Sequence, residues 1–152
     1  FQDDQETPDT IVATYDFGGS GIVWDGSSCV ARTGEALPFV TFYGDGASLS
    51  MDSGAGWRIV DHLGKPVRSA KGRFVDVPHF TNFIEAIRSG ATLNAEIGEG
   101  QKSTMLCHLG NIAYRTRSTL KLDAATGKLV QASGEARRLW GRDYRRGWEP
   151  KV

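Results

Sequence analysis

The first half of the chain alternates apolar and polar positions with a period of two, which is typical of half-buried strands. The segment TIVATYDF places Ile11, Ala13, Tyr15 and Phe17 on one side of such a strand. A glycine pair then predicts a tight turn into a second strand, SGIVWD. Two further runs, PFVTFYGDGASLSMD and GWRIVDHLGKPV, continue the strand pattern with glycine turns. We therefore expect a largely antiparallel sheet, mainly over residues 10–70.

After Pro78 the apolar spacing changes to that of an amphipathic helix. The apolar residues recur at i, i+3, i+4 and i+7, as Phe80, Phe83, Ile84 and Ile87. Proline suits the first turn of a helix and glycine suits the position just after its last turn. Pro78 and Gly90 therefore predict a helix over about residues 78–89.

The rest of the chain predicts two more helices. A polar connection leads into a longer helix over about 99–117, and LKLDAATGKLV is typical of a short hairpin. SGEARRLW predicts a helix over about 133–140, followed by an arginine-rich tail at 141–152. Strands followed by helices indicate an α+β fold: a largely antiparallel open sheet with helices packed on one face. We expect a single domain over 1–152, and self-association through the uncovered sheet face.

Composition excludes several classes of protein. Lys and Arg total 18 and Asp and Glu total 18, so no net charge favours nucleic acid or an anionic membrane. No apolar run approaches the roughly 18 residues of a membrane span. The tail ARRLWGRDYRRGWEP mixes arginines with aromatics, a pattern open to single-stranded nucleic acid or to docking on the domain. We expect docking, and neither a nucleic-acid nor a membrane partner.

No short segment of the chain has the residue spacing that a cofactor-binding or metal-binding motif requires. Gly19-Ser20-Gly21 and Gly54-Ala55-Gly56 lack a third glycine and lead into strands rather than helices. GEGQKST separates its last glycine from the lysine that a phosphate-binding loop requires directly after it. The three histidines lie far apart, and neither H-E-x-x-H nor C-x-x-C occurs. We therefore expect no cofactor-binding and no metal-binding residue in this chain.

The segment MLCHLGNIAYRTRS, residues 105–118, carries the clearest candidate chemistry. At about 100° per residue, Cys107 and His108 diverge around a helix, so they do not form a nucleophile–base pair. His108, Asn111 and Arg115 form a polar stripe along one flank. Two interpretations stay open: a hydrogen-bonded helix flank, or the lining of a substrate cleft or domain-docking surface.

The other sides of the same helix are also distinct. Met105, Leu109, Ile112 and Ala113 form an apolar face for the core. Ser103, Cys107 and Gly110 form a strip of small residues that permits another element to approach closely. The two cysteines, Cys29 and Cys107, are too few for a disulfide framework, and we expect reduced thiols.

Two strings in the second half of the chain resemble a known family. They are HFTNFIEAIRSGATLNAEIGEGQKSTMLCHLGNIAYRTRSTLKLD and DYRRGWEP. They look like the C-terminal domain of a bacterial branch of the glucose-fructose oxidoreductase / inositol dehydrogenase / MocA (Gfo/Idh/MocA) family. PDTIVATYDF, FYGDGASLSMD and GWRIV are similar to sheet strands of that branch, so the resemblance covers essentially the whole chain.

The resemblance implies the substrate-side and oligomerisation domain of an NAD(P)-dependent oxidoreductase. An N-terminal Rossmann domain would bind NAD or NADP, and hydride transfer would act on a sugar, polyol or derivative. The open sheet would mediate formation of a homo-oligomer. The family's glycine-rich fingerprint, its Glu-Lys-Pro motif and its histidine-bearing helix have no counterpart here. No catalytic residue is therefore carried over, and the chain alone is expected to be inactive and to bind no cofactor.

Several expectations follow for the intact protein. The missing motifs and the first residue, Phe1, predict that this chain is the C-terminal part of a longer polypeptide. The candidates for lining a substrate cleft or docking the Rossmann domain are His108, Asn111 and Arg115. We expect a cytoplasmic enzyme, with periplasmic location through twin-arginine export as the alternative. The alternative function is a non-catalytic self-associating or carbohydrate-binding module, with Tyr15, Trp24 or Phe42 exposed on a sheet face.

Overall fold

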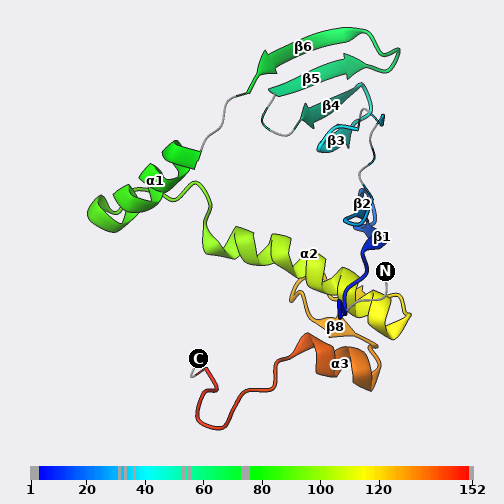
Figure 1. Ribbon diagram of the computed structural model, residues 1–152, viewed down its shortest axis with the longest axis vertical. Helices are drawn as coiled ribbons and strands as arrows, with labels where there is room; N and C mark the ends of the chain where they lie inside the picture. Colours follow the sequence, from blue (N-terminus) through cyan, green and yellow to red (C-terminus); the bar gives the residue numbers. More distant parts are fainter. Residues whose placement is uncertain are drawn as a thin grey trace. The chain divides into compact units, whose positions relative to one another are not determined.

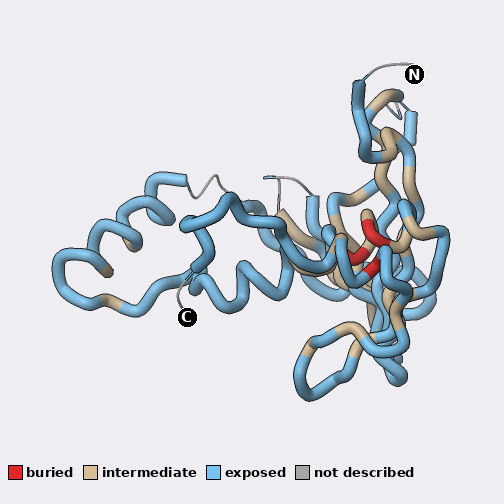
Figure 2. Tube along the Cα trace, turned by 90° about the horizontal axis from the view of Figure 1, so that it is seen from below, coloured by how far each residue is buried: buried red, intermediate tan, exposed pale blue. Residues whose placement is uncertain are grey.

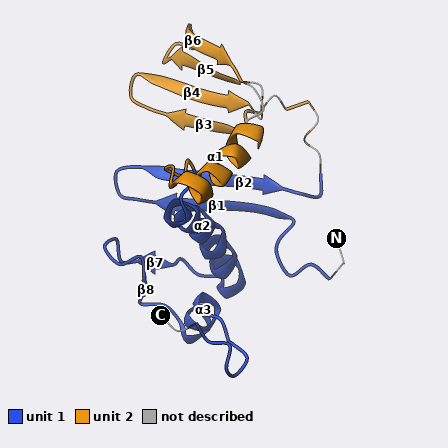
Figure 3. Cartoon of the chain, turned by 90° about the vertical axis from the view of Figure 1, so that its left-hand side faces the viewer, with its two compact units in different colours: residues 1–31, 95–152 blue, residues 32–94 orange. Residues whose placement is uncertain are grey.

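The chain divides into two compact units, coloured separately in Figure 3. Unit 1 comprises residues 1–31 and 95–152, and unit 2 comprises residues 32–94. The computed structural model describes residues 4–30, 32, 34–35, 37–52, 54, 56–72 and 76–150.

Unit 1 begins with a two-stranded antiparallel ribbon. Strand β1 (Thr10–Asp16) pairs with β2 (Gly21–Ser27), and Figure 1 shows both in blue. The turn between them places Gly18 at φ 83°, a backbone conformation that side chains with a Cβ rarely adopt. The Asp16 carboxylate accepts a hydrogen bond from the Gly18 N–H at 2.8 Å. The sequence thus specifies this turn through a glycine and the acid before it.

The long helix α2 (Ile97–Thr116) organises the rest of unit 1. It lies between the β1–β2 ribbon and the short helix α3 (Gly134–Trp140), as Figures 1 and 3 both show. The two-residue strands β7 (Lys121–Leu122) and β8 (Leu129–Val130) form the expected hairpin between the helices. The N–H of Ala136 donates to the N-cap oxygen of Ser133, which fixes the start of α3.

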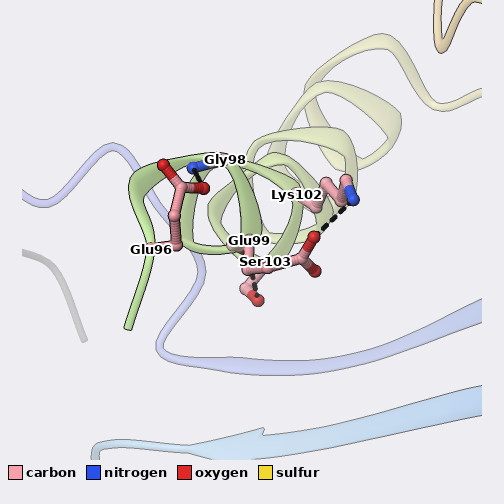
Figure 4. A network of polar contacts seen from close by, with 5 residues as sticks. All are labelled: Glu96, Gly98, Glu99, Lys102 and Ser103. Atoms are coloured by element: carbon pink, nitrogen blue, oxygen red, sulfur yellow. Dashed lines mark hydrogen bonds and ion pairs between the residues drawn. The ribbon is translucent and has the colours of Figure 1, made fainter. Parts of the chain in front are cut away.

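Local hydrogen bonds set both ends of α2. Its N-cap residue Glu96 accepts a hydrogen bond from the Gly98 N–H at 2.6 Å, shown in Figure 4. One turn further, the ammonium of Lys102 pairs with the Glu99 carboxylate at 2.6 Å. The helix ends where Arg117 adopts the left-handed conformation at φ 49°. The carboxylates near the start of α2 suit the positive end of its dipole.

The buried core of the described residues is small and lies in unit 1. It consists of Leu109 and Ile112 of α2 with Ala136 of α3, two helices that contact one another. Figure 2 colours the few buried positions red against a mostly exposed trace. Met105 and Ala113 are half-buried beside them, so the apolar face expected for this helix is the face that packs.

Unit 2 contains a four-stranded antiparallel meander. Its strands β3 (Val40–Tyr43), β4 (Ala47–Asp52), β5 (Gly56–Asp61) and β6 (Pro66–Lys71) pair in chain order. The Asp61 carboxylate accepts hydrogen bonds from the N–H groups of Leu63 and Lys65, at 2.9 and 2.8 Å. These bonds hold the β5–β6 turn.

The register gives this sheet two different faces. Phe42 pairs with Leu49 and Leu49 with Ile59, while the neighbouring pairs join Met51 to Trp57. Because side chains alternate across a strand, these apolar residues share one face of the sheet. The opposite face carries polar residues: Thr41, Ser48, Ser50, Arg58 and Ser69. One face of the sheet is thus mainly apolar, although it also carries Arg68 opposite Ile59. The other face is rich in hydroxyls and also carries Tyr43 and Val60.

Helix α1 (Asp76–Ser89) completes unit 2, and none of its residues is buried. The side chain of Asn82 holds the chain after the helix. Its Nδ2 donates to the Thr92 carbonyl at 2.8 Å, and its Oδ1 accepts from the Asn94 N–H at 2.9 Å. Gly90 lies at φ 70°, as expected for a glycine that ends a helix.

The fold class expected from the sequence is confirmed as α+β with antiparallel sheets and three helices. The strands of the described residues form three separate sheets rather than one, because the ribbon β1–β2 is not hydrogen-bonded to β3–β6. Residues 28–39 join these two sheets, a longer connection than the turns that pair neighbouring strands. Within the described segments, no helix is long and apolar enough to cross a membrane.

Candidate functional site

The polar flank of α2 lines a shallow pocket of about 170 Å³ in unit 1. His108, Asn111 and Arg115, singled out from the sequence, all contribute to its wall. The remaining lining residues are Glu6, Thr7, Pro8, Ile112, Tyr114 and Leu139. The structure therefore brings the three candidates together on one surface, with the N-terminal segment and α3 as the other walls.

Arg115 provides the permanent positive charge among these lining residues. Its Nη2 lies 3.3 Å from Oε2 of Glu6, and the two side chains are 46% and 77% exposed. An ion pair this exposed contributes little stability, about 0–1 kcal/mol. The guanidinium therefore faces solvent and already contacts a carboxylate.

Asn111 and His108 lie along the same flank, one and two turns before Arg115. Asn111 is half-buried and His108 is exposed. Within the described residues, neither side chain has a hydrogen-bond partner. The amide has two donors and an acceptor, and the imidazole has a nitrogen available at each edge. The flank thus offers polar groups suited to hydroxyl and carboxylate recognition.

Another side of α2 is the strip of small residues, and β1 packs against it at Gly110. Tyr15 Oη donates a hydrogen bond to the Leu106 carbonyl at 2.7 Å. A Cβ added to Gly110 would lie 2.9 Å from Tyr15 Oη and 3.7 Å from the Ala13 Cβ. The close approach expected from Ser103, Cys107 and Gly110 therefore occurs at Gly110.

This packing affects one titratable group. Burial raises the pKa of the Tyr15 phenol above its ordinary value of 10.0, and the nearby Cys107 adds a smaller contribution in the same direction. The neutral phenol is the form that can donate to the Leu106 carbonyl. Tyr15 also contacts α2 and is half-buried, so of the three aromatics named for the alternative function it is not an exposed one.

The cysteines do not join the pocket. Cys107 is exposed and its Sγ lies 4.0 Å from the Ser103 carbonyl, whereas His108 lines the pocket. Cys29 Sγ lies 3.3 Å from Thr10 Oγ1. In the part of the chain that the structure describes, no group of three or more His, Cys, Asp or Glu residues could hold a metal ion.

The aromatic residues of the arginine-rich tail were expected to dock on the domain, and the structure shows a different arrangement. The Arg142 guanidinium lies 5.7 Å from the centre of the Tyr144 ring, a cation–π contact within the tail itself. Trp148 is 74% exposed, so the expectation that it docks on the domain is wrong.

Four pocket residues from outside α2 were not expected from the sequence: Glu6, Thr7, Pro8 and Leu139. The helical pattern identifies one flank of α2 but carries no information on which distant segments cover it. Glu6 lies four residues before β1, and β1 packs on α2, which brings Glu6 near that helix. Long-range pairing of this kind depends on the whole fold rather than on local spacing.

Comparison with known proteins gives no support for any family: no family model, no curated protein and no solved structure matches the chain. The likeness to the Gfo/Idh/MocA family therefore stays a prediction from the sequence motifs.

Proposed function

We propose that this chain is the substrate-side and oligomerisation domain of an NAD(P)-dependent oxidoreductase that acts on a sugar, polyol or derivative. Its finer fold would be that of a Gfo/Idh/MocA C-terminal domain, with helices covering one face of an open sheet. The observation that carries the proposal is the pocket lined by His108, Asn111 and Arg115. Motifs similar to that family provide the second support.

The size of the pocket fits half of a binding site. Sites that enclose a small molecule usually measure about 300–1,000 Å³, whereas this pocket measures about 170 Å³. A second wall from the nucleotide-binding domain would complete it and would supply the nicotinamide cofactor, NAD or NADP. In that cleft, Arg115, Asn111 and His108 would bind and orient hydroxyl or acidic groups of the substrate.

Cofactor binding distinguishes this domain from a complete enzyme. We expect calorimetry to detect no NADH binding by this chain and saturable binding by the longer polypeptide. Tight NADH binding by the chain alone would refute the proposal.

The coding sequence upstream of the Phe1 codon gives a cheaper test, because the proposal expects an in-frame G-x-G-x-x-G motif there. A start codon or a signal peptide directly before Phe1 would favour the binding-module alternative.

The polar flank can be tested in the longer enzyme. Replacing His108, Asn111 and Arg115 together by Ala should lower activity or loosen docking of the nucleotide-binding domain. Arg117→Gln is the matched control, because Arg117 follows the same helix and does not line the pocket. Unchanged kinetics and stability in the triple variant would end this part of the proposal.

Self-association would use the apolar face of the β3–β6 sheet. Phe42 lies on that face and is 59% exposed, which leaves a large apolar side chain available to a second copy. Light scattering should show a dimer or larger assembly that Phe42→Lys disrupts. Thr41→Lys on the opposite face should leave the assembly unchanged. A monomer at high concentration would contradict this expectation.

The second candidate function is a carbohydrate-binding module without catalysis. Trp24 and Phe42 are both more than half exposed, and sugars stack on such rings. They belong to different sheets, and Tyr15 faces α2 instead. Sugar binding that survives loss of the α2 flank but not Trp24→Ala would favour this candidate.

A further inference from the structure

The ion pair on the α2 flank shows which kind of group Arg115 binds. Oε2 of Glu6 lies 3.3 Å from its Nη2, and Glu6 comes from a segment outside the helix. A guanidinium presents a planar set of donors that matches a carboxylate. Because the pair is exposed at both ends, a carboxylate from solvent can reach the same donors.

The neighbours of Arg115 define the rest of the ligand. Asn111 and His108 have no side-chain partner within the described residues and lie on the same flank, where they can meet hydroxyl groups. Ile112, Leu139 and Pro8 add apolar walls. Arg115 is the lone permanently charged cation among the lining residues, so the pocket suits one acidic group rather than several.

We infer that this pocket binds the carboxylate of a hydroxylated acid, such as a uronic acid, and that Glu6 is its internal competitor. The inference rests on the proposed function in that the ligand is a sugar derivative. Arg115 binds the carboxylate, and Asn111 and His108 bind adjacent hydroxyls. Glu6 occupies Arg115 when no ligand is present and is displaced when one enters.

The test uses the ¹⁵N-labelled 152-residue chain and two probes that differ in one group, galacturonate and galactose. At equal ionic strength, galacturonate should shift the Asn111 side-chain amide and the Arg115 Nε–H signals in saturable fashion. Because an ion pair at an exposed guanidinium adds little free energy, galactose should bind about two- to fivefold more weakly. Equal binding of both probes would overturn the inference while leaving the proposed function in place.

Variants assign the effect to the ion pair. Arg115→Gln should abolish the preference for galacturonate, Arg115→Lys should keep part of it, and Arg117→Gln should keep all of it. Glu6→Gln should tighten galacturonate binding by about two- to fivefold, the range for removal of a competing surface ion pair. Binding that ignores Arg115, or that weakens in Glu6→Gln, contradicts the inference.

Absence of binding by either probe would also overturn the inference. The proposed function would then be judged separately, by the upstream reading frame and by NADH binding to the longer polypeptide. The two failures are therefore distinguishable.

Discussion

Helices α1 and α2 differ in how far the structure uses their apolar faces. The apolar positions of α1 recur with regular helical spacing, yet none of its residues is buried. The apolar face of α2 is less pronounced along the sequence, but Leu109 and Ile112 are buried and each side of the helix has a distinct neighbour. Apolar periodicity therefore predicts that a helix forms and which of its faces is apolar. It does not predict which partner covers that face.

The largest expected effect is on the free energy of unfolding, when one apolar side chain of each helix is replaced by alanine. Leu109→Ala removes a 6% exposed side chain from the core, which should cost about 2–5 kcal/mol. Ile84→Ala on α1, where the side chain is 43% exposed, should cost less than about 1 kcal/mol. Urea unfolding followed by circular dichroism measures both. Equal losses would mean that the apolar face of α1 is covered in solution.

Substitution of Gly110 in α2 should have the next largest effect on the free energy of unfolding, with Gly100 of the same helix as the comparison. Gly110→Leu places a side chain against Tyr15 and Ala13, and overpacking of this kind costs about 1–3 kcal/mol. Gly100→Leu is the matched control, because an added Cβ there meets nothing within 4 Å. That control should be neutral or stabilising, since leucine is the better helix former. A stabilised Gly110→Leu variant would show that β1 does not pack on this strip.

Local sequence predicted much of what α2 does. The strip of small residues marks the side that β1 approaches. Helical spacing groups His108, Asn111 and Arg115 on one flank, and that flank lines the pocket. These features repeat every three or four residues, so they can be read from a short window. The glycine turn at Gly18 and the end of α1 at Gly90 were predictable for the same reason.

The parts that could not be predicted depend on contacts between distant segments. Glu6 reaches Arg115 across more than a hundred residues, and no local pattern records that pairing. The alternating pattern predicts one sheet over 10–70, and no local signal in it indicates that β1–β2 and β3–β6 form separate sheets. The mixed arginine and aromatic composition of the tail favours docking of its aromatics on the domain, yet Trp148 is exposed, because composition does not specify a docking surface.

Tyr15 provides a test of the β1–α2 contact through pH. Tyr15→Phe removes the hydrogen bond to the Leu106 carbonyl and should cost about 0.5–1.5 kcal/mol near neutral pH. Since folding raises the phenol pKa, this stabilisation is present below the unfolded pKa and is lost as pH rises through the folded pKa. The wild-type advantage over Tyr15→Phe should therefore stay constant below the ordinary phenol pKa of 10.0 and shrink as pH rises above it in paired urea titrations. An advantage that grows with pH would contradict the packing described.

The smallest expected effect concerns the hydrogen bonds by which Asn82 of α1 holds the segment after the helix. Asn82→Ala removes the acceptor of the Asn94 N–H and the donor to the Thr92 carbonyl, both exposed. Exchange of the Asn94 amide hydrogen with solvent should accelerate about fivefold, the equivalent of roughly 1 kcal/mol for a single bond. Asn82→Asp retains the acceptor and should keep the Asn94 protection while losing the bond to Thr92. Because neither bond is part of a core, amides in the β3–β6 sheet should exchange at unchanged rates. Accelerated exchange throughout that sheet would show that Asn82 couples the helix to the strands, and α1 would then resemble α2 in having a structural partner.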